Sequence, residues 1–338
     1  LLFLSALLPI PIHGVMAAAG KSKGAVMGPD ENLKIAMMNH VDGGNMSRIK
    51  EAALDTSATS LTLRRTLLPA LPLSSLPTHI TTLDVGNNSL GPHAFNALLL
   101  YAAKSPYLTS LDAPNNLASN DCCATLARLV ATNPRLLSLN VANNPFTTSA
   151  SKLLGDAFGS NKTLQHLDLS SCGLVDAGEL LGGLSGHPAL KSLVVNNNAC
   201  GKGSWKKLGD SMAAGLRLSA LGARGVEMGD EGAAGLAPGL KASGSLTDLD
   251  ASGSLLGSSG ACSLLEALAE HKGINRIELG DNSLSVLGDS SLRALKAIAR
   301  KNSLSEAGFG NTSLSEGDAV ELVRCLCTCQ AIKRVDVG

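Results

Sequence analysis

The chain has 338 residues, 28 basic and 28 acidic side chains, and a composition that is 44 % apolar but only 2 % aromatic. Balanced charge argues against a nucleic-acid-binding protein, which would carry a strongly basic face. Leu, Ala and Gly dominate, and this composition favours a thin, repetitive core over a single globular centre.

The first 57 residues do not share the pattern of the rest of the chain. Residues 1–20 form an apolar N-terminal arm, whose opening LLFLSALLPIPI is too short and too rich in proline to span a membrane. Its origin stays open between a fragment, a signal peptide and a translated stretch upstream of Met16. If residues 1–15 are retained, we expect them to contact another protein or a membrane. Residues 21–57 lack a strong period and are interpreted as a linker or a degenerate N-terminal cap, with an imperfect first repeat near 33–41.

Residues 58–338 repeat one phrase, apolar-x-x-apolar-x-apolar-x-x-Asn-x-apolar. It is clearest in ITTLDVGNNSL (80–90), LLSLNVANNPF (136–146) and INRIELGDNSL (274–284). Most copies follow one another at 28 residues, and a fixed period of that size predicts a solenoid of about 11 repeats, which ends within a repeat. The second apolar residue of each copy is called the register mark here, and the marks are Leu61, Leu83, Leu111, Leu139, Leu167, Leu193, Leu221, Leu249, Ile277, Ala307 and Val335.

Each repeat is predicted to begin with a strand and a turn. Apolar residues alternate around the mark with the two-residue period of a half-buried strand. The Asn five positions after the mark can hydrogen-bond the turn and the next coil, so stacked Asn residues predict a ladder. Cys172 and Thr312 are milder substitutes at this position, and Val226 leaves its turn without a side-chain amide.

The second half of each repeat has a helical period. Residues 12, 15 and 19 positions after the mark fall on one face of a helix, as Phe95, Leu98 and Ala102 do in one repeat. Pro, Gly or Asn then precedes the next strand, for example in Asn133-Pro134 and His187-Pro188. The repeat is therefore predicted to run strand, turn, helix, loop, and one repeat alone cannot bury its apolar face.

The phrase and its length resemble the leucine-rich repeat family, in its ribonuclease-inhibitor-like class of 28-residue repeats. The resemblance covers residues 58–338. It implies an α/β fold, a right-handed solenoid or horseshoe with a concave parallel β-sheet and convex helices. Geometry favours the same curvature, because strands stack about 4.8 Å apart whereas packed helices need about 8–10 Å.

Two irregular regions interrupt the array. The repeat that follows Leu167 is two residues short and contains Gly182-Gly183, and the lone tryptophan, Trp205, takes an inward slot of the next helix. We interpret Trp205 as filling space beside its shortened neighbour, and the alternative is an exposed anchor for a partner. Residues 215–260 are rich in glycine, so we expect the loosest part of the array there.

The eight cysteines do not form paired spacings, and Cys172 and Cys200 take core positions. Reduced core thiols are the simplest interpretation, and they favour an intracellular compartment, whether cytoplasmic, ciliary or organellar. In Cys325-x-Cys327-x-Cys329 only the first and last thiols share a helix face, and no histidine lies near in sequence. We therefore predict no metal site and no cofactor.

The residues that flank each mark are predicted to face the concave side of the sheet. Position by position, the residue after the mark is mostly acidic, and its neighbours are small. The pattern indicates a shallow acidic line that either binds a basic helix or tail or keeps the sheet soluble. The candidate partner-binding residues are Asp84, Asp112, Asn140, His166, Asp168, Asp250, Glu278 and Asp336.

No catalytic residue is predicted. His166 and Asp168 lie on the face that also carries Ser138 and Ser192, but no nucleophile elbow or oxyanion-hole motif accompanies them. The leading hypothesis is a non-catalytic protein–protein interaction scaffold, a subunit of a larger assembly whose open terminal strand either continues or is covered by a partner. The alternative is a regulator of a small GTPase, because Ran GTPase-activating proteins look like this array, although the acidic tail that they add is absent here. The partners are predicted to be proteins, not nucleic acids.

Overall fold

The computed structural model describes residues 55, 57, 59–64, 76–146 and 149–337. The chain divides into two compact units, Leu1–Glu31 and Asn32–Gly338, and every described residue belongs to the second. The predicted N-terminal arm, nearly all of the predicted linker and the imperfect repeat near 33–41 lie outside the described residues. Residues 65–75, between the marks Leu61 and Leu83, also lie outside the described residues.

Within the described ranges, eleven three-residue strands form one open parallel sheet in sequence order. Each strand is centred on its register mark, and strand pairing aligns the marks one with the next, from Leu61 with Leu83 to Ala307 with Val335. The predicted register is confirmed at every repeat. The strands are β1 (Ser60–Thr62), β2 (Thr82–Asp84), β3 (Ser110–Asp112), β4 (Ser138–Asn140), β5 (His166–Asp168), β6 (Ser192–Val194), β7 (Ala220–Gly222), β8 (Asp248–Asp250), β9 (Arg276–Glu278), β10 (Glu306–Gly308) and β11 (Arg334–Asp336).

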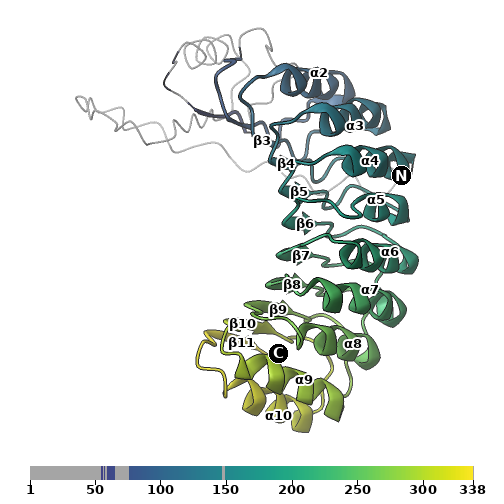
Figure 1. Cartoon of the computed structure of the whole chain (residues 1–338), viewed down its shortest axis with the longest axis vertical. Helices are drawn as coiled ribbons and strands as arrows, with labels where there is room; N and C mark the ends of the chain where they lie inside the picture. Colours follow the sequence, from purple (N-terminus) through teal and green to yellow (C-terminus); the bar gives the residue numbers. More distant parts are fainter. Residues whose placement is uncertain (1–54, 56, 58, 65–75, 147–148, 338) are drawn as a thin grey trace, which may run out of the picture. The chain divides into compact units, whose positions relative to one another are not determined.

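A helix follows nearly every strand, and in Figure 1 the labelled helices lie on one side of the strands. The predicted inward residues Phe95, Leu98 and Ala102 are buried, and so are the residues at the same offsets in α3 and α8; in α5 and α9, whose repeats are not 28 residues long, the first offset falls on the exposed Glu179 and Asp289. This repeat unit is therefore an α/β solenoid. The helices are α2 (Gly91–Lys104), the short 3₁₀ turn η2 (Asn120–Cys122), α3 (Cys123–Thr132), α4 (Ser149–Ser160), α5 (Gly178–Gly183), α6 (Lys202–Ala213), α7 (Gly229–Ser243), α8 (Ser258–Leu268), α9 (Asp289–Arg300) and α10 (Glu316–Leu326).

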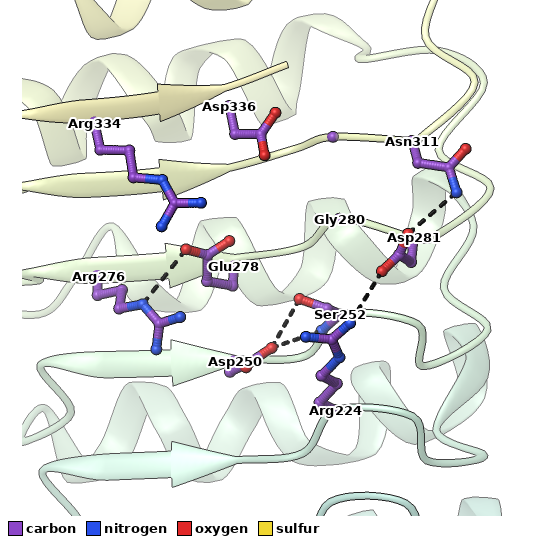
Figure 2. A pocket seen from close by; sticks show the side chains of 11 residues that line it. Arg224, Asp250, Ser252, Arg276, Glu278, Gly280, Asp281, Asn311, Arg334 and Asp336 are labelled. Carbon is purple, nitrogen blue, oxygen red and sulfur yellow. Dashed lines mark hydrogen bonds and ion pairs between the residues drawn. The ribbon is translucent and has the colours of Figure 1, made fainter. Parts of the chain in front are cut away.

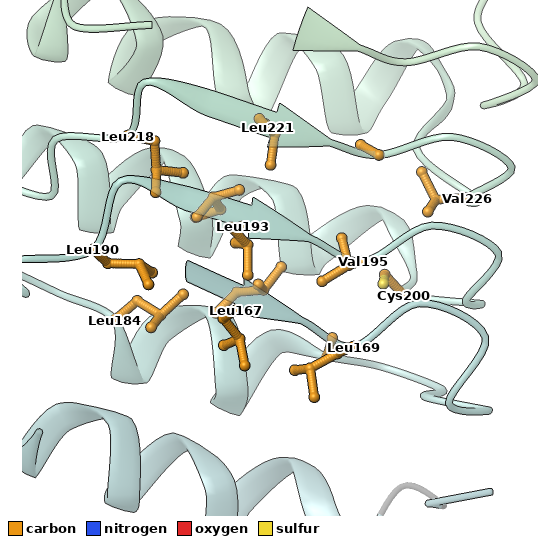
Figure 3. Packing of buried hydrophobic residues seen from close by; sticks show 14 of the residues in the cluster. Leu167, Leu169, Leu184, Leu190, Leu193, Val195, Cys200, Leu218, Leu221 and Val226 are labelled. Atoms are coloured by element: carbon orange, nitrogen blue, oxygen red, sulfur yellow. The ribbon is translucent and has the colours of Figure 1, made fainter. Parts of the chain in front are cut away.

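The core runs between the strands and the helices as stacked layers of like residues. Figure 3 shows Leu167, Leu193 and Leu221, the marks of three successive repeats, in one such layer. Each is at most 2 % exposed. Burial of a leucine side chain stabilises the fold by about 1.5–3 kcal/mol, so the repeated mark supplies a driving force at every step of the stack.

The predicted asparagine ladder is present, and each rung joins two repeats. Asn144 Oδ1 accepts hydrogen bonds from the N–H groups of Asn116 and Ala118, both at 3.0 Å. Its Nδ2 donates to the carbonyl oxygens of Ala113 (3.1 Å) and Val141 (2.9 Å). One buried side chain thus satisfies four backbone groups that the solenoid removes from water.

Substitutes on the ladder keep only part of this bonding. The Cys172 thiol donates to the Val141 carbonyl at 3.4 Å, and the Thr312 hydroxyl donates to the Phe309 carbonyl at 2.6 Å. Val226 is buried and carries no hydrogen-bonding group. The predicted ranking of these substitutes is confirmed.

A second polar ladder, which the sequence analysis did not find, lies six residues before the mark. Asn161 Nδ2 donates to the Val130 carbonyl (2.7 Å), and its Oδ1 accepts from the N–H of Leu164 (2.8 Å). In the next repeat the same position is His187, whose Nδ1 accepts from the N–H of Leu190 at 3.1 Å. An imidazole nitrogen that accepts carries no proton, so the neutral ring fits this rung. Burial lowers the pKa of His187, and the Lys162 charge lowers it further.

Trp205 is fully buried in α6, so the predicted interior role is confirmed and the exposed anchor is excluded. The space for the indole comes from Gly232 of α7, in the following repeat, where an added Cβ would lie 2.9 Å from Trp205 Cδ1. The shortened neighbour, α5, is covered instead by Lys207. The Lys207 stem passes 3.6 Å from the Cβ position of Gly182, and its ammonium pairs with Glu179 at 2.6 Å.

Glycines bring the helix backbones of the middle repeats into direct contact. An added Cβ on Gly239 of α7 would lie 2.5 Å from the carbonyl carbon of Gly209 in α6. The reverse contact is similar, because an added Cβ on Gly209 would lie 2.6 Å from the Gly235 oxygen. The glycine-rich stretch therefore packs closely against its neighbour, and loss of side chains there permits approach of two helices.

All eight cysteines lie in the described part of the chain and are free thiols. Burial raises the pKa of Cys172 and of Cys200 to about 12, which keeps both thiols protonated. Cys325 and Cys329 are buried whereas Cys327 is exposed, but α10 ends at Leu326, so the three cysteines do not share one helix as the sequence predicted. Among the described residues, no cluster of His, Cys, Asp and Glu could hold a metal ion, and no helix is long and apolar enough to cross a membrane.

We expect Gly239→Ala to lower the free energy of unfolding by about 1–3 kcal/mol, because the new methyl group meets backbone that cannot rotate away. Urea unfolding followed by circular dichroism measures the change. The matched control is Gly203→Ala in α6, where an added Cβ meets nothing within 4 Å. That variant should be neutral or more stable by about 0.4–1 kcal/mol, and equal destabilisation of both would contradict the packing argument.

We expect His187→Asn to weaken the loss of stability at acidic pH. Because the folded-state pKa of His187 lies below its unfolded value, the unfolded chain takes up the proton first. Its contribution is therefore present above about pH 6.5 and is lost as the pH falls. Asparagine supplies the same acceptor without titrating, as Asn161 does one repeat earlier. Unfolding free energies measured from neutral to mildly acidic pH test this, and identical pH slopes for both proteins would rule it out.

Candidate interaction surface

The face of the sheet opposite the helices carries the side chains that flank each mark. In most strands the mark is buried and its two neighbours are half-buried, as in β2, β3 and β8. Strand pairing places these neighbours in straight rows across the sheet. We call the row that directly follows the marks the carboxylate row, and it comprises Thr62, Asp84, Asp112, Asn140, Asp168, Val194, Gly222, Asp250, Glu278, Gly308 and Asp336.

The eight predicted binding residues all lie on these strands. Seven belong to the carboxylate row, and His166 precedes the mark of β5, where it is exposed. The row is divided by Val194 and Gly222, and again by Gly308. The structure therefore places Asp84, Asp112, Asn140 and Asp168 on four adjacent strands, β2 to β5, and Asp250 and Glu278 on the adjacent strands β8 and β9, with Asp336 beyond Gly308 on β11.

At the N-terminal end, an arginine of the chain itself occupies the carboxylate row. Arg64 lies three residues after the Leu61 mark, and its guanidinium group binds both Asp84 and Asp112. Asn140 then donates from Nδ2 to Asp112 Oδ1 at 2.7 Å. These four side chains form a continuous network across β1 to β4, so this end of the row is not an open acidic surface.

The pKa values of this network follow from burial and from its charges. Burial raises the pKa of Asp112, and the neighbouring Asp84 charge raises it further, while Arg64 and Asn140 act in the opposite direction. The hydrogen bond to Asp84 raises the pKa of Arg64, which stays protonated. Arg64 therefore offsets a repulsion that two stacked carboxylates would otherwise feel.

In the middle of the row, Asp168 turns toward its own backbone. Its Oδ1 accepts from the Ser170 N–H (2.9 Å) and hydroxyl (2.6 Å). Strand pairing places His166 between Ser138 and Ser192. In the described structure, no hydrogen bond joins His166 to either serine or to Asp168.

At the C-terminal end, the face is hollowed by a depression of about 500 Å³. Figure 2 shows its lining, in which Asp250 accepts from the Ser252 N–H (3.1 Å) and hydroxyl (2.8 Å). Arg276 Nε lies 3.4 Å from carboxylate oxygens of both Glu278 and Glu306. Its ionisable lining residues are four carboxylates and three guanidinium groups, namely Asp250, Glu278, Asp281, Asp336, Arg224, Arg276 and Arg334.

The arginines of this face are the functional residues that sequence reasoning missed. Arg64 and Arg224 both stand three residues after a mark, and Arg276 and Arg334 both stand one residue before a mark. A comparison of the residues at every offset from the marks, and not only of those directly after the marks, would have found these arginines.

Comparison with known proteins adds little beyond the geometry. No protein-family model matches the sequence, and no curated protein matches it. Among solved structures, one similar chain is from a crystal structure of the Rad7 and Elc1 complex in yeast, at 14 % identity and a TM-score of 0.38, with 82 % of this chain and 86 % of that chain covered. Another is leiomodin-1 actin-binding site 2, at 15 % identity and a TM-score of 0.34, with 44 % of this chain and 85 % of that chain covered.

We expect Arg64→Ala to raise the pKa of Asp112 further, because the substitution removes both the charge and the hydrogen bond that lower it. Titration of the aspartate carboxyl carbons by ¹³C NMR measures the shift. Arg224→Ala is the matched control, since Arg224 has the same offset from its mark but pairs with Asp281. A pKa of Asp112 that is unchanged in Arg64→Ala would show that the ion pair does not form in solution.

Proposed function

We propose that this protein is a non-catalytic protein–protein interaction scaffold, a subunit of a larger intracellular assembly. The observation that carries this proposal is a parallel sheet of eleven described strands whose helices lie on one side only. The other face presents polar and charged side chains in regular rows. A long, regular face of this kind suits the docking of an extended partner.

We further propose that the repeats belong to the leucine-rich repeat family, in its ribonuclease-inhibitor-like class. Three features support this: the repeated phrase, the dominant step of 28 residues, and a ladder of asparagines with the bonding of Asn144. The alternation of short strands and helices agrees with the same class.

The absence of catalysis is also part of the proposal. It is supported by the openness of the face and by the bonding of Asp168 and Asp250, which both hold the serine two residues later. A carboxylate that accepts hydrogen bonds from the turn that follows it fits a structural role better than a catalytic one. An intracellular location is supported by the eight free thiols, since secreted proteins commonly pair their cysteines.

The test is to tag the protein in its native cells, purify it under native conditions and size it by gel filtration and mass spectrometry. We expect it to co-migrate with a stable set of other proteins. Elution at its own mass with no partner would contradict the scaffold proposal. Capture of a small GTPase alone, with faster GTP hydrolysis in its presence, would replace the scaffold by the regulator.

Matched variants locate the docking face in the same experiment. Asp168→Arg with Asp250→Arg adds bulk and positive charge to the open face of the sheet. Asp156→Arg with Glu266→Arg makes the same change of charge at exposed positions of α4 and α8, on the helix side. We expect the first pair to release the partner and the second pair to retain it, and the reverse result would assign docking to the helices.

A further inference from the structure

The loops that lead from a helix into the next strand carry much of the positive charge of this chain. Seven of the nine described loops of this kind hold one lysine or arginine each, whereas their only acidic residue is Glu270. In the other two repeats a lysine stands in the last turn of the preceding helix, as Lys104 does in α2 and Lys241 in α7. We call this row of exposed cations the basic edge, and it comprises Lys104, Arg135, Lys162, Lys191, Arg217, Lys241, Lys272, Lys301 and Lys333.

The loops at the opposite edge, from a strand into the next helix, have the opposite charge. Their described acidic residues are Asp176, Glu227 and Asp281, and their described basic residue is Arg224. The net charge of zero therefore conceals two edges of opposite sign. Part of this sorting stabilises the helices, because carboxylates are favourable at helix N-termini and cations at helix C-termini.

Only some cations of the basic edge serve the helices in this way. Lys162 Nζ donates to a carbonyl group in the last turn of α4 at 2.9 Å, and Arg217 Nη1 donates to the carbonyl group of the last residue of α7 at 3.2 Å. Lys104 and Arg135, by contrast, make no side-chain hydrogen bond or ion pair within the described structure. No described carboxylate of the chain neutralises these two charges, which are therefore available to a partner.

The loops beside Lys104 and Arg135 also expose two large apolar side chains. Tyr107 is 56 % exposed and Leu137 is 37 % exposed, and no other loop of the basic edge exposes a large apolar residue within the described ranges. The two loops run side by side, because the Leu137 N–H donates to the Thr109 carbonyl at 2.8 Å. Tyr107 and Arg135 occupy the same position in them, four residues before the mark. Two free cations and two exposed apolar groups are thus gathered at two neighbouring loops.

A proline stiffens each of these loops. Pro106 precedes Tyr107 and Pro134 precedes Arg135, and a proline ring fixes its own φ at about −65°. Asn133 holds the second loop further, since its Oδ1 accepts from the Arg135 N–H at 2.8 Å. A backbone that is already fixed loses little entropy when a partner binds, and this raises the affinity that a small patch can reach.

We propose that these four side chains, Lys104, Tyr107, Arg135 and Leu137, bind an acidic segment of a partner protein that carries an apolar residue between its carboxylates. Tyrosine and arginine are enriched among the residues that anchor protein interfaces. A single-stranded nucleic acid fits less well, because its bases need successive aromatic platforms and Tyr107 is the one exposed aromatic residue in the described loops of this edge. The inference rests on the scaffold function proposed above and names the chemistry of a second docking point, beside the open face of the sheet.

The test uses the whole chain and a short fluorescein-labelled peptide in which glutamates alternate with leucine and phenylalanine. Fluorescence anisotropy measures its binding. The same peptide with glutamine for glutamate should bind about tenfold more weakly, and with serine for leucine and phenylalanine about threefold more weakly or worse. Equal binding of the three peptides, no binding of the first, or tighter binding of a labelled oligothymidine would each overturn the proposal.

Variants that remove charge assign the site. Lys104→Gln with Arg135→Gln should weaken binding of the acidic peptide about tenfold. The matched control is Lys272→Gln with Lys333→Gln, which removes two cations of the same edge that also have no side-chain partner in the described structure but have no exposed large apolar residue in their loops. It should change binding less than about twofold. An equal loss in the control would show that any part of the basic edge suffices, and it would overturn the assignment.

A second pair of variants tests the apolar groups. Tyr107→Ser with Leu137→Ser should weaken binding about fivefold or more, because both side chains are expected to leave water in the complex. Leu255→Ser with Val286→Ser is the control, since these side chains are 69 % and 55 % exposed but lie at the opposite edge. It should stay within about twofold of the unchanged protein, and equal effects of the two pairs would contradict the proposal.

Co-purification from native cells separates this inference from the scaffold function. Lys104→Glu with Arg135→Glu should release the protein that carries the acidic segment and retain the rest of the assembly. An assembly that stays complete in this variant removes the patch alone. Absence of any partner of the unchanged protein removes the scaffold function itself.

Discussion

Each repeat of this solenoid is completed by hydrogen bonds that it cannot make alone. The side chain of Asn144 accepts from N–H groups of the preceding repeat and donates to carbonyl groups of both repeats. A buried backbone group without a partner destabilises a fold by about 1–3 kcal/mol. Burial of the apolar marks therefore requires the ladder, and the ladder requires a neighbour, so stability is a property of adjacent pairs of repeats. At Val226 the ladder has no side-chain hydrogen bond, and its turn is joined to the next repeat by backbone bonds, such as that from the Gly225 N–H to the Ser252 carbonyl at 2.8 Å.

The helix layer shows how such a stack adjusts its own spacing. Strands fix a separation of about 4.8 Å between repeats, and helices with ordinary side chains separate by about 8–10 Å. Glycine contacts such as Gly209 with Gly239 let α6 and α7 approach through their backbones. Glycine is a poor helix former, and α7 nevertheless runs for 15 residues. Within the glycine-rich stretch, Gly235 and Gly239 of α7 permit this close packing, whereas Gly225, Gly244 and Gly253 adopt a positive φ.

The strands, the helix faces and the asparagine ladder could be predicted because the same amino acid, or the same class of amino acid, recurs at a fixed offset from each mark. The ladder six residues before the mark was missed because its chemistry is conserved while its letters change, from Asn161 to His187. The partners of the arginines could not be predicted by comparing residues at the same offset from the marks, for another reason. Arg64 and Arg224 have the same offset but different partners, since the residue that competes for them is Asn115 in one case and Asp281 in the other. Which of several neighbouring carboxylates an arginine pairs with depends on local geometry, and the periodicity of the sequence does not encode that geometry.

The carboxylate row itself shows why net charge along a repeat is a poor guide to recognition. Stacked carboxylates repel across adjacent strands, and the sheet relieves that repulsion in three ways. Arg64 bridges two of them, Asn140 replaces a third, and Gly222 and Gly308 leave gaps. A carboxylate that is already paired with an arginine of the same chain is less available to a basic partner. The partner would have to displace that arginine, which the chain holds beside the carboxylate. An acidic position can recruit a partner only where that internal relief is incomplete. At the C-terminal end the relief has a different source, because Arg224 is drawn to Asp281 while Arg276, on the same strand as Glu278, lies 3.4 Å from the carboxylates of both Glu278 and Glu306.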